Sequence, residues 1–515
     1  MLILLLLLSS QSAPPTQEKE TLVLNRQFIA RLPNDIPDNH WAVSADGRGA
    51  AWIVRNHVET GGKPGVEYTS IVKLAVLADG RPIYTAAKKD RFVVVTGVEE
   101  GPESSGGPDF FLTPGGRHFA YMVLGANDRR MNFIDGKPGD FYVSVDLPTF
   151  SPDGARVGYI AEKPGKKFLA VVDGKEGPEY AVVGPIVFSP DGSQFAHTAG
   201  EGKGVFVSCN YKRSDVFDSI SDVLVGPEGK NLVFIATLRQ KKMVVLNGRL
   251  GKQYDDIRSL VSTPDRNAVA YVAVTGKQQM VVVGDKEGPI AQTIENLALS
   301  ANGQTATYVI REAGLMIVGT NDRRGSPFTE VSPPVVSSDG STVAYAATIQ
   351  PGKMAAVIND KQGQIYEGVG RPVIAAKSNM VAYRAIANRK AFIIYGGVKQ
   401  DEFVEVSDPA LSVDGGKLAY RANDREGYHL VIGKKKGDPY QEVEPPFITS
   451  GGRIVARARF YNCPAVIVDG NLSAGPKDSG WLWVGPITVS KNGSRVGFPI
   501  IVKRGGAREI WWEAP

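Results

Sequence analysis

The residues that most often build catalytic and metal sites are scarce in this chain. Its 515 residues include two cysteines and five histidines, and the sequence contains neither a CxxC nor an HxxxH spacing. Metal sites need clusters of such ligands, so no metal site is predicted. The chain also lacks a Gly-x-Ser-x-Gly segment, the nucleophile elbow of an appended hydrolase domain. No catalytic residue and no cofactor follow from the sequence.

Neither sign of charge dominates the chain. It has 59 Lys and Arg against 54 Asp and Glu, and its basic residues are spread through the turns rather than gathered in one run. A nucleic-acid partner is therefore not predicted. The two cysteines, Cys209 and Cys463, lie far apart in the repeat pattern described below, so we expect small buried apolar side chains and no disulfide.

The one long apolar run lies at the start of the chain. Residues 1–13 combine a leucine-rich core with small residues, which predicts a secretory signal cleaved after Ser12, and residues 14–24 form a polar linker. The run is too short to span a bilayer, and no cysteine follows it as a lipid anchor would require. We expect a periplasmic or secreted protein. Because no basic residue precedes the core, a misplaced start or a peripheral apolar tail is the alternative.

What the chain has in abundance is repetition. A large side chain, usually aromatic, recurs in the middle of an apolar run, and from the second copy to the twelfth every step is 37 or 38 residues. A fixed period of this size indicates a stacked or radial repeat fold. The thirteen positions are Trp52, Tyr84, Tyr121, Tyr159, His197, Phe234, Tyr271, Tyr308, Tyr345, Tyr383, Tyr420, Arg457 and Phe498.

Each repeat contains four short strands joined by tight turns. In the repeat from 265 to 302, β-branched runs are bounded by Gly, Asp and Asn, which is typical of strands and hairpins. Asp-Gly and Asn-Gly pairs end many runs, as in tight hairpins, and Ser-Pro-Asp-Gly at 151–154 and 189–192 favours type I turns. The middle strands are apolar on both faces, so both faces are expected to be covered.

These features predict an all-β fold of β-propeller repeats with about thirteen four-stranded blades. Thirteen exceeds the usual four to eight blades in one ring. We therefore expect two consecutive propellers, one of six and one of seven blades. The first would span 25–260 and the second 261–515.

The Ser-Pro-Asp-Gly turn, the aromatic-centred strand after it and the Val-Val-Asp-Gly hairpin at 171–174 resemble the TolB-like, WD40-like (PD40-type) β-propeller repeat family. The resemblance runs from about Trp41 to Phe498. It implies the propeller fold and a location outside the cytoplasm. The extra α/β domain that precedes the propeller in TolB has no counterpart here.

One group of residues breaks the repeat. Arg384 and Arg421 follow the central aromatic residue where most repeats have Ile, Val, Thr or Ala, and Arg457 lies in the next repeat. Ion pairs between blades are one explanation, with Glu402, Glu405 or Glu442 as partners, because a buried guanidinium must be paired. The other is a ligand-binding site for an anion or carboxylate, which the arginine fork suits.

Repeats of this kind supply a scaffold, and the fold alone does not determine function. The sequence favours a non-enzymatic, exported β-propeller scaffold that binds a protein, peptide or cell-envelope ligand. The alternative is a propeller-based hydrolase or lyase acting on a glycan or peptide, with its site at the mouth of a ring. A third possibility is a degenerate sensor or scaffold region severed from a larger system.

Overall fold

The computed structural model describes residues 25–113, 115–460, 462–472, 481–490, 493–504 and 507–514. Over these residues the fold is all-β, and its helical elements are two 3-10 turns, η1 (Ala126–Asp128) and η2 (Pro227–Gly229). The expected signal sequence and linker lie outside the described residues. No helix in the described part is long and apolar enough to cross a membrane.

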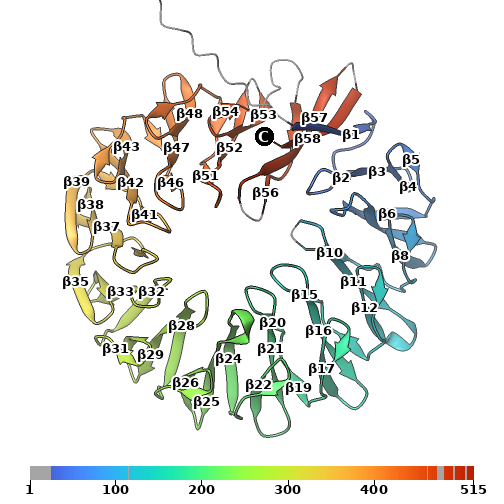
Figure 1. The fold of residues 1–515 in the computed structure, drawn as a ribbon, viewed down its shortest axis with the longest axis horizontal. Helices are drawn as coiled ribbons and strands as arrows, with labels where there is room; N and C mark the ends of the chain where they lie inside the picture. Colours follow the sequence, from blue (N-terminus) through green and yellow to red (C-terminus); the bar gives the residue numbers. More distant parts are fainter. Residues whose placement is uncertain are drawn as a thin grey trace, which may run out of the picture.

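Thirteen antiparallel blades, numbered 1 to 13 along the chain, confirm the expected fold class. The first strand of each blade lies toward the centre of the assembly (Figure 1). In six blades it is split in two. These inner strands are β2 (Trp41–Val43), β6 (Ser70–Val76), β10 (Phe110–Leu112), β14 (Ser144–Val145) with β15 (Thr149–Phe150), β19 (Val182–Val183) with β20 (Val187–Phe188), β24 (Ser219–Val225), β28 (Asp256–Ser262), β32 (Thr293–Leu299), β36 (Val335–Val336), β40 (Gly368–Val369) with β41 (Val373–Ile374), β45 (Glu405–Val406) with β46 (Ala410–Leu411), β50 (Glu442–Val443) with β51 (Phe447–Ile448), and β55 (Trp481–Val484) with β56 (Thr488–Val489).

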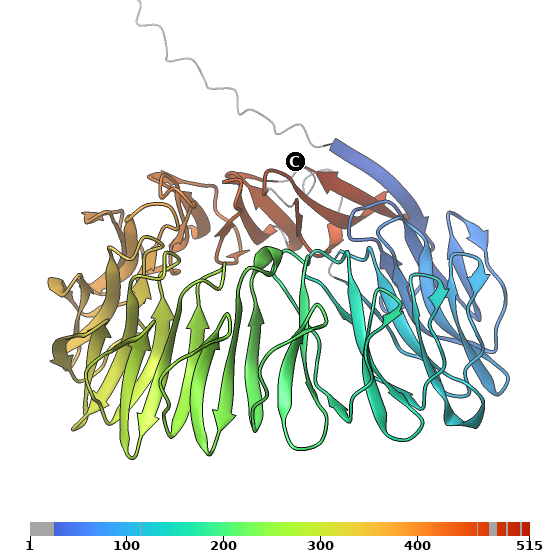
Figure 2. The same cartoon turned by 60° about the horizontal axis from the view of Figure 1, so that its bottom comes forward.

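The second and third strands form the long central hairpin of each blade (Figure 2). The second strands are β3 (Ala50–Val54), β7 (Pro82–Lys88), β11 (Phe119–Leu124), β16 (Val157–Lys163), β21 (Phe195–Gly200), β25 (Leu232–Leu238), β29 (Val269–Thr275), β33 (Ala306–Glu312), β37 (Val343–Gln350), β42 (Val381–Ala387), β47 (Leu418–Asp424), β52 (Ile454–Phe460) and β57 (Val496–Arg504). The third strands are β4 (His57–Thr60), β8 (Arg91–Thr96), β12 (Arg130–Ile134), β17 (Lys167–Val172), β22 (Val205–Cys209), β26 (Lys241–Leu246), β30 (Gln278–Val283), β34 (Leu315–Thr320), β38 (Lys353–Ile358), β43 (Lys390–Tyr395), β48 (Gly427–Ile432), β53 (Cys463–Val468) and β58 (Ala507–Ala514).

The outer strands are mostly two residues long and rich in lysine. Short, charged edges discourage pairing with other chains. They are β5 (Lys63–Pro64), β9 (Glu99–Glu100), β13 (Lys137–Pro138), β18 (Lys175–Glu176), β23 (Lys212–Arg213), β27 (Arg249–Leu250), β31 (Lys286–Glu287), β35 (Arg323–Phe328), β39 (Lys361–Tyr366), β44 (Val398–Lys399), β49 (Lys435–Lys436), β54 (Asn471–Leu472) and, in blade 13, β1 (Asn25–Leu32).

The two ends of the chain close the blades into one ring (Figure 1). β1 pairs antiparallel with β58 and becomes the outer strand of blade 13. Blade 13 then packs on blade 1 through an apolar cluster that includes Leu32, Trp52 and Ile510. The seam of the ring is therefore built from both ends of the sequence.

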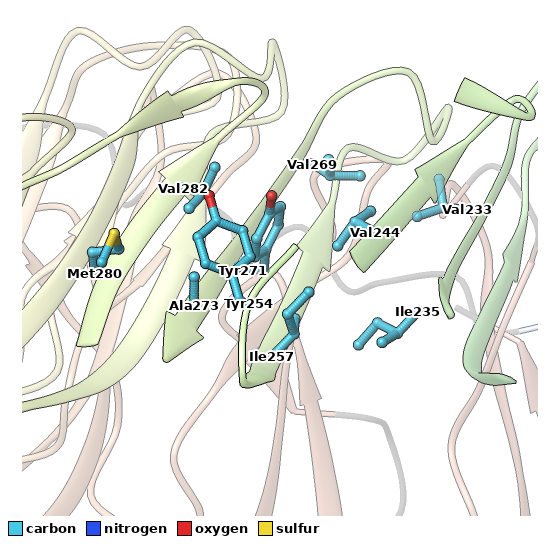
Figure 3. Packing of buried hydrophobic residues seen from close by; sticks show 10 residues of the cluster. All are labelled: Val233, Ile235, Val244, Tyr254, Ile257, Val269, Tyr271, Ala273, Met280 and Val282. Atoms are coloured by element: carbon cyan, nitrogen blue, oxygen red, sulfur yellow. The ribbon is translucent and has the colours of Figure 1, made fainter. Parts of the chain in front are cut away.

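The expected division into two rings near residue 260 differs from this arrangement. Blades 6 and 7 meet there through one apolar cluster, in which Val233 and Ile235 pack with Ile257 and Tyr271 (Figure 3). Two separate rings would each need a closing contact, whereas the closing strand β1 joins the last blade to the first. In place of rings of six and seven blades, the chain forms a single ring of thirteen.

The recurring aromatic residue lies in the second strand of its blade and is buried in twelve of the thirteen positions named from the sequence. The exception is Arg457. The hairpin hydrogen bond from Asp469 N to Ile454 O matches the one from Gly433 N to Leu418 O in blade 11, and this alignment places Ala456 in the aromatic position. The sequence assignment of Arg457 to that position was therefore wrong by one residue.

A second layer of aromatic side chains, absent from the sequence prediction, lies on the segments between blades. Tyr254 packs edge-on against Tyr271 with 6.1 Å between ring centroids, and its hydroxyl donates to Glu287 Oε1 over 2.7 Å. Such T-shaped pairs add to the energy of simple burial. Equivalent pairs are Tyr68–Tyr84, Tyr142–Tyr159, Phe217–Phe234 and Phe403–Tyr420.

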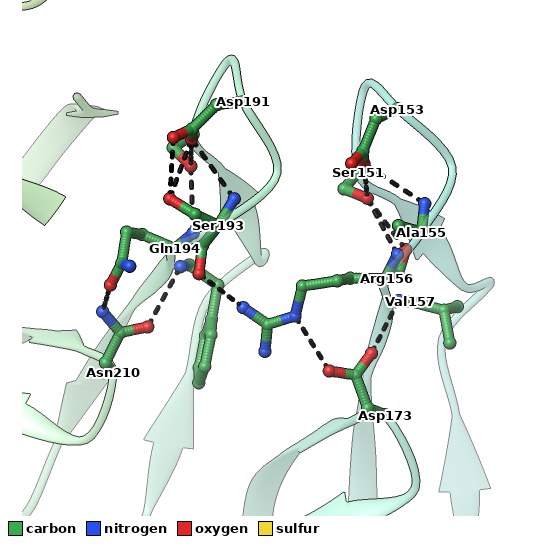
Figure 4. Close-up of polar contacts among 12 residues, drawn as sticks. Ser151, Asp153, Ala155, Arg156, Val157, Asp173, Asp191, Ser193, Gln194 and Asn210 are labelled. Atoms are coloured by element: carbon green, nitrogen blue, oxygen red, sulfur yellow. Dashed lines mark hydrogen bonds and ion pairs between the residues drawn. The ribbon is translucent and has the colours of Figure 1, made fainter. Parts of the chain in front are cut away.

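The turn between the first and second strands is a hydrogen-bonded unit (Figure 4). In blade 4, Ser151 Oγ donates to Asp153 Oδ1 over 2.6 Å and accepts from Arg156 N over 2.9 Å. Asp173, in the hairpin between the third and fourth strands, accepts from the first N–H of β16 and pairs with Arg156 Nε at 2.8 Å. Arg156 also reaches the carbonyl of Ser193 in blade 5. Polar side chains thus fill the turn of blade 4 and join it to blade 5.

Candidate functional site

The structure places the three arginines at one level of neighbouring blades. With Ala456 in the aromatic position, each arginine directly follows the central residue of its second strand. The three occupy equivalent sites, because Arg384, Arg421 and Arg457 pair with Ile393, Leu430 and Val466 at the same position of the third strand. They lie on the second strands of blades 10, 11 and 12. The row is therefore more regular in the structure than in the sequence.

Each guanidinium has a different partner. Arg384 Nε lies 3.6 Å from Asp408 Oδ1, Arg421 pairs with Glu405, and Arg457 donates to the carbonyl of Gly485 over 2.7 Å. Of the three carboxylates expected from sequence, Glu405 pairs with one of these arginines. The other two, Glu402 and Glu442, bind Lys399 and Arg459. These contacts fit inter-blade and intra-blade pairing.

A group of titratable side chains that the sequence analysis missed lies at one end of blade 11. Ligand atoms of Asp424, Glu426 and His429 lie within 4.8 Å of one another, as metal ligands would. Lys436 Nζ, however, lies 3.0 Å from Asp424 and 2.8 Å from Glu426. His429 is fully buried and its Nδ1 faces the carbonyl of Gly437 at 3.0 Å. The ammonium of Lys436 thus lies between the two carboxylates, where a metal cation would have to bind. The sequence signal was the Asp-x-Glu-x-x-His spacing.

A cavity of about 650 Å³ lies in blades 9, 10 and 11 on the turn face, the side of the ring that carries the turns between the first and second strands. This volume lies in the range of roughly 300–1,000 Å³ that ligand pockets occupy. Its apolar wall combines Ile358, Met380, Val381 and the rings of Tyr383 and Tyr395. Its polar rim is formed by Thr342, Ser378, Asn379 and Asp414 with Gly396, Gly397, Gly415 and Gly416.

The cavity lies where blade 10 lacks the polar groups of the repeat. Ala375 and Lys377 replace the turn serine and aspartate, and Gly396 replaces the hairpin aspartate or asparagine. The backbone is nevertheless the usual one, because Gly396 N bonds to Val381 O over 2.9 Å as Asp173 N bonds to Val157 O. The other blades keep at least one of the three groups. We attribute the cavity to the absence of these three polar side chains from blade 10.

Neighbouring blades hold the walls of this cavity in place. Lys377 N donates to Val413 O over 2.7 Å, and the Tyr395 hydroxyl donates to the carbonyl of Gly415. On the other side, Asn379 donates to Asp339 over 3.3 Å. The cavity is therefore a preformed feature of three blades.

Tyr383 forms the inner wall of the cavity. Its exposed fraction is 7 %, against 1 % for both Tyr345 and Tyr420 in the neighbouring blades. Burial raises the pKa of Tyr383 to about 12, so its hydroxyl stays protonated. No hydrogen bond joins this hydroxyl to another described residue.

A smaller cavity of about 300 Å³ lies in blade 1 beside the seam of the ring. Asp35, His40, His57 and Glu67 contribute to its lining. His57 Nε2 lies 3.4 Å from Glu59 Oε1, whereas its Nδ1 is buried and has no partner among the described residues. Among the described residues, the imidazole of His57 therefore has a polar partner at Nε2 and none at Nδ1.

The sequence matches no known protein family and no curated protein. Solved structures match parts of the ring: the dihydro-heme d1 dehydrogenase NirN in complex with DHE (13 % identity, TM-score 0.26, 56 % of this chain and 73 % of that chain) and TolB from Acinetobacter baumannii (13 %, 0.23, 58 % and 80 %). A third is the β-propeller domain of the Trilobed protease from Pyrococcus furiosus, which has an open velcro topology (12 %, 0.24, 50 % and 94 %). At such identities and TM-scores the likeness is one of fold, and no activity or ligand follows from it.

Proposed function

We propose that this protein is a non-enzymatic, exported scaffold that binds a protein, peptide or cell-envelope ligand. The observation that carries the proposal is the cavity of blades 9–11. It combines apolar and aromatic walls with a few polar groups, the usual makeup of a ligand site. It also lies in the blade that lacks all three of the polar turn and hairpin side chains, of which every other blade keeps at least one.

The matched substitutions Asn379→Trp and Ser193→Trp test this proposal. Both residues are exposed and follow the same turn by one position, but Asn379 lines the cavity and Ser193 lies in blade 5. Binding of the full chain to peptide libraries and to solubilised cell-envelope fractions would be measured by biolayer interferometry. We expect saturable binding that falls at least tenfold in Asn379→Trp and is unchanged in Ser193→Trp.

Two results would contradict the scaffold role. Release of products from glycans or peptides by the purified chain would support a hydrolase or lyase instead. Absence of saturable binding to any of these ligands would remove the proposal altogether. For export, expression with the native N-terminus followed by N-terminal sequencing should give extracytoplasmic protein beginning near Ala13.

Arg384, Arg421 and Arg457 are retained as candidate anion contacts of the same scaffold. Their observed partners support a structural role. If pairing is their role, Arg421→Met leaves Glu405 without its partner and lowers the melting temperature. If they bind an anion, the variant instead loses stabilisation by carboxylate ligands, which act on the folded state by mass action. Thermal melts with and without a panel of carboxylates distinguish the two.

A further inference from the structure

We propose that the cavity of blades 9–11 takes a lysine or arginine side chain of a peptide ligand. The charged end would lie at Asp414, and the methylene stem between Met380, Tyr383 and Tyr395. This inference rests on the proposed binding function and names the chemistry of its ligand. Four features of the site support it.

The first feature is charge. Asp414 is the only Asp, Glu, Lys, Arg or His among the residues that line the cavity. The nearest basic side chain of the same turn, Lys417, is directed away from the cavity, because its Nζ donates to the carbonyl of Gly452 in blade 12 over 2.6 Å. The residues that line the cavity therefore carry a single charge, which is negative, and Lys417 lies outside the lining but near enough to attract Asp414.

The second feature is the state of that carboxylate. Ser412 Oγ and Gly416 N both donate to Asp414 Oδ1, over 2.5 and 3.0 Å. These bonds, that from Ser412 first, lower the pKa of Asp414 below its ordinary value. The second oxygen, Oδ2, accepts no hydrogen bond from another described residue. It is thus ionised and available, and a charge-assisted bond to an ammonium or guanidinium is among the stronger ones.

The third feature is the apolar wall. Lysine and arginine bury their methylene stems on apolar surface while the charged end reaches a polar group. Met380 offers a flexible thioether that adapts to such a stem. The rings of Tyr383 and Tyr395 add a cation–π attraction when a cation lies within about 6 Å of a ring centre. An acidic or neutral polar side chain would gain neither contact.

The fourth feature is the rim. Asn379 and Ser378 line the cavity beside Asp414, and the Asn379 amide points to Asp339 of blade 9. Hydrogen bonds from Ser337 and Ser341 lower the pKa of Asp339 to about 2, so this carboxylate is also ionised at neutral pH. The turns of blades 9 and 11 on either side of the cavity are therefore negative, whereas the turn of blade 10 between them carries Lys377.

Fluorescence anisotropy with short labelled Gly-Ser peptides tests the inference directly. The peptides carry a single central lysine, arginine, norleucine or glutamate. The full chain is compared with Asp414→Asn and with the matched control Asp191→Asn, which lies in the same kind of turn in blade 5, where Ser189 Oγ donates to Asp191 Oδ1 over 2.5 Å. Asparagine keeps an acceptor for the turn bonds in both variants, and thermal melts confirm that both are folded.

We expect the lysine and arginine peptides to bind at least tenfold more tightly than the norleucine peptide, and the glutamate peptide most weakly. Asp414→Asn should abolish the preference and Asp191→Asn should preserve it. In the unmodified protein, added salt should weaken binding of the lysine peptide more than that of the norleucine peptide. This last comparison needs no variant.

Equal binding of the lysine and norleucine peptides would overturn the inference, as would a preference that survives in Asp414→Asn. If the single residue Nα-acetyl-lysine amide, with its side-chain ammonium free, bound as tightly as the lysine peptide, the assignment of a peptide ligand would be overturned. If envelope ligands bind and respond to Asn379→Trp while none of the peptides shows a charge preference, the proposed function stands and this inference fails. If nothing binds, both fail.

Discussion

Blades 4 and 10 have the same backbone but opposite turn faces. In blade 4, the side chains of Ser151, Asp153 and Asp173 form the hydrogen bonds and the ion pair of the turn, and Arg156 extends the network to blade 5 (Figure 4). In blade 10, Ala375, Lys377 and Gly396 occupy the three corresponding positions, and a cavity of about 650 Å³ lies beside them. The comparison shows that the strands specify the blade, whereas the turn side chains decide whether its face is filled or open.

The largest expected effect compares the aromatic positions of a filled and an open blade. Tyr271→Ala removes a ring that is buried and packed edge-on against Tyr254, so it should lower the free energy of unfolding by about 3–5 kcal/mol. Tyr383→Ala should cost less, about 2–3 kcal/mol, because one side of that ring already faces the cavity. Urea denaturation measures both. Equal losses would show that the cavity does not reach Tyr383.

A smaller effect is expected where the turn network is broken. Asp173→Ala removes the acceptor of the first N–H of β16 and the partner of Arg156, so it should destabilise the fold by about 1–3 kcal/mol. The matched change Gly433→Ala, in the hairpin of blade 11, adds a methyl group at a positive φ of 58° and removes no hydrogen bond. Gly433→Ala therefore measures the cost of alanine at a positive φ. An Asp173→Ala variant as stable as the unmodified protein would show that the polar network of blade 4 does not contribute.

The period of the sequence predicts the blades because each blade repeats the same backbone hydrogen bonds. The strands, the tight turns and twelve of the thirteen central residues followed from it. The number of rings did not, because it depends on the small angle between successive blades, which accumulates over the whole chain. That angle is set by packing between blades, such as Val233 and Ile235 against Tyr271, and no single residue type reveals it.

One residue was assigned wrongly and one cavity was not predicted, each for a local reason. Arg457 was taken as a central residue because it keeps the 37-residue step, but the turn from Thr449 to Arg453 is one residue shorter than the turn from Ser412 to Lys417. The sequence did not predict the cavity, because the cavity results from polar side chains that blade 10 lacks. Ala375, Lys377 and Gly396 are unremarkable alone, and their joint effect appears when strands separated in sequence meet.

A gain of stability is expected from restoring one missing group in blade 10. The hairpin residue Gly396 has φ 56°, close to the 52° of Asp173 and the 49° of Asn359. Asparagine tolerates this conformation, so Gly396→Asn should cap the N–H of Val381, reduce the freedom of the unfolded chain and add about 0.4–1 kcal/mol. The new side chain would meet Met380 Sδ, a flexible end. The same variant should also weaken binding of ligands in the cavity, because its amide occupies part of the rim. A stabilised variant with unchanged binding would place the ligand elsewhere.

The smallest expected effect is a difference in acid response between the turns of blades 9 and 10. Ser337 and then Ser341 lower the pKa of Asp339 from 3.8 to about 2. A carboxyl whose folded pKa is depressed stabilises the fold above its unfolded pKa, and this contribution is lost as the pH falls from about 4 to about 2. Lys377 takes the corresponding place in blade 10, so that turn has no such response. Carboxyl chemical shifts of ¹³C-labelled aspartate, assigned with Asp339→Asn, should show Asp339 still ionised at pH 3. A midpoint near 3.8 would mean that the serine bonds of the filled turn do not hold the carboxylate in solution, and the contrast between the two turn faces would then be one of volume alone.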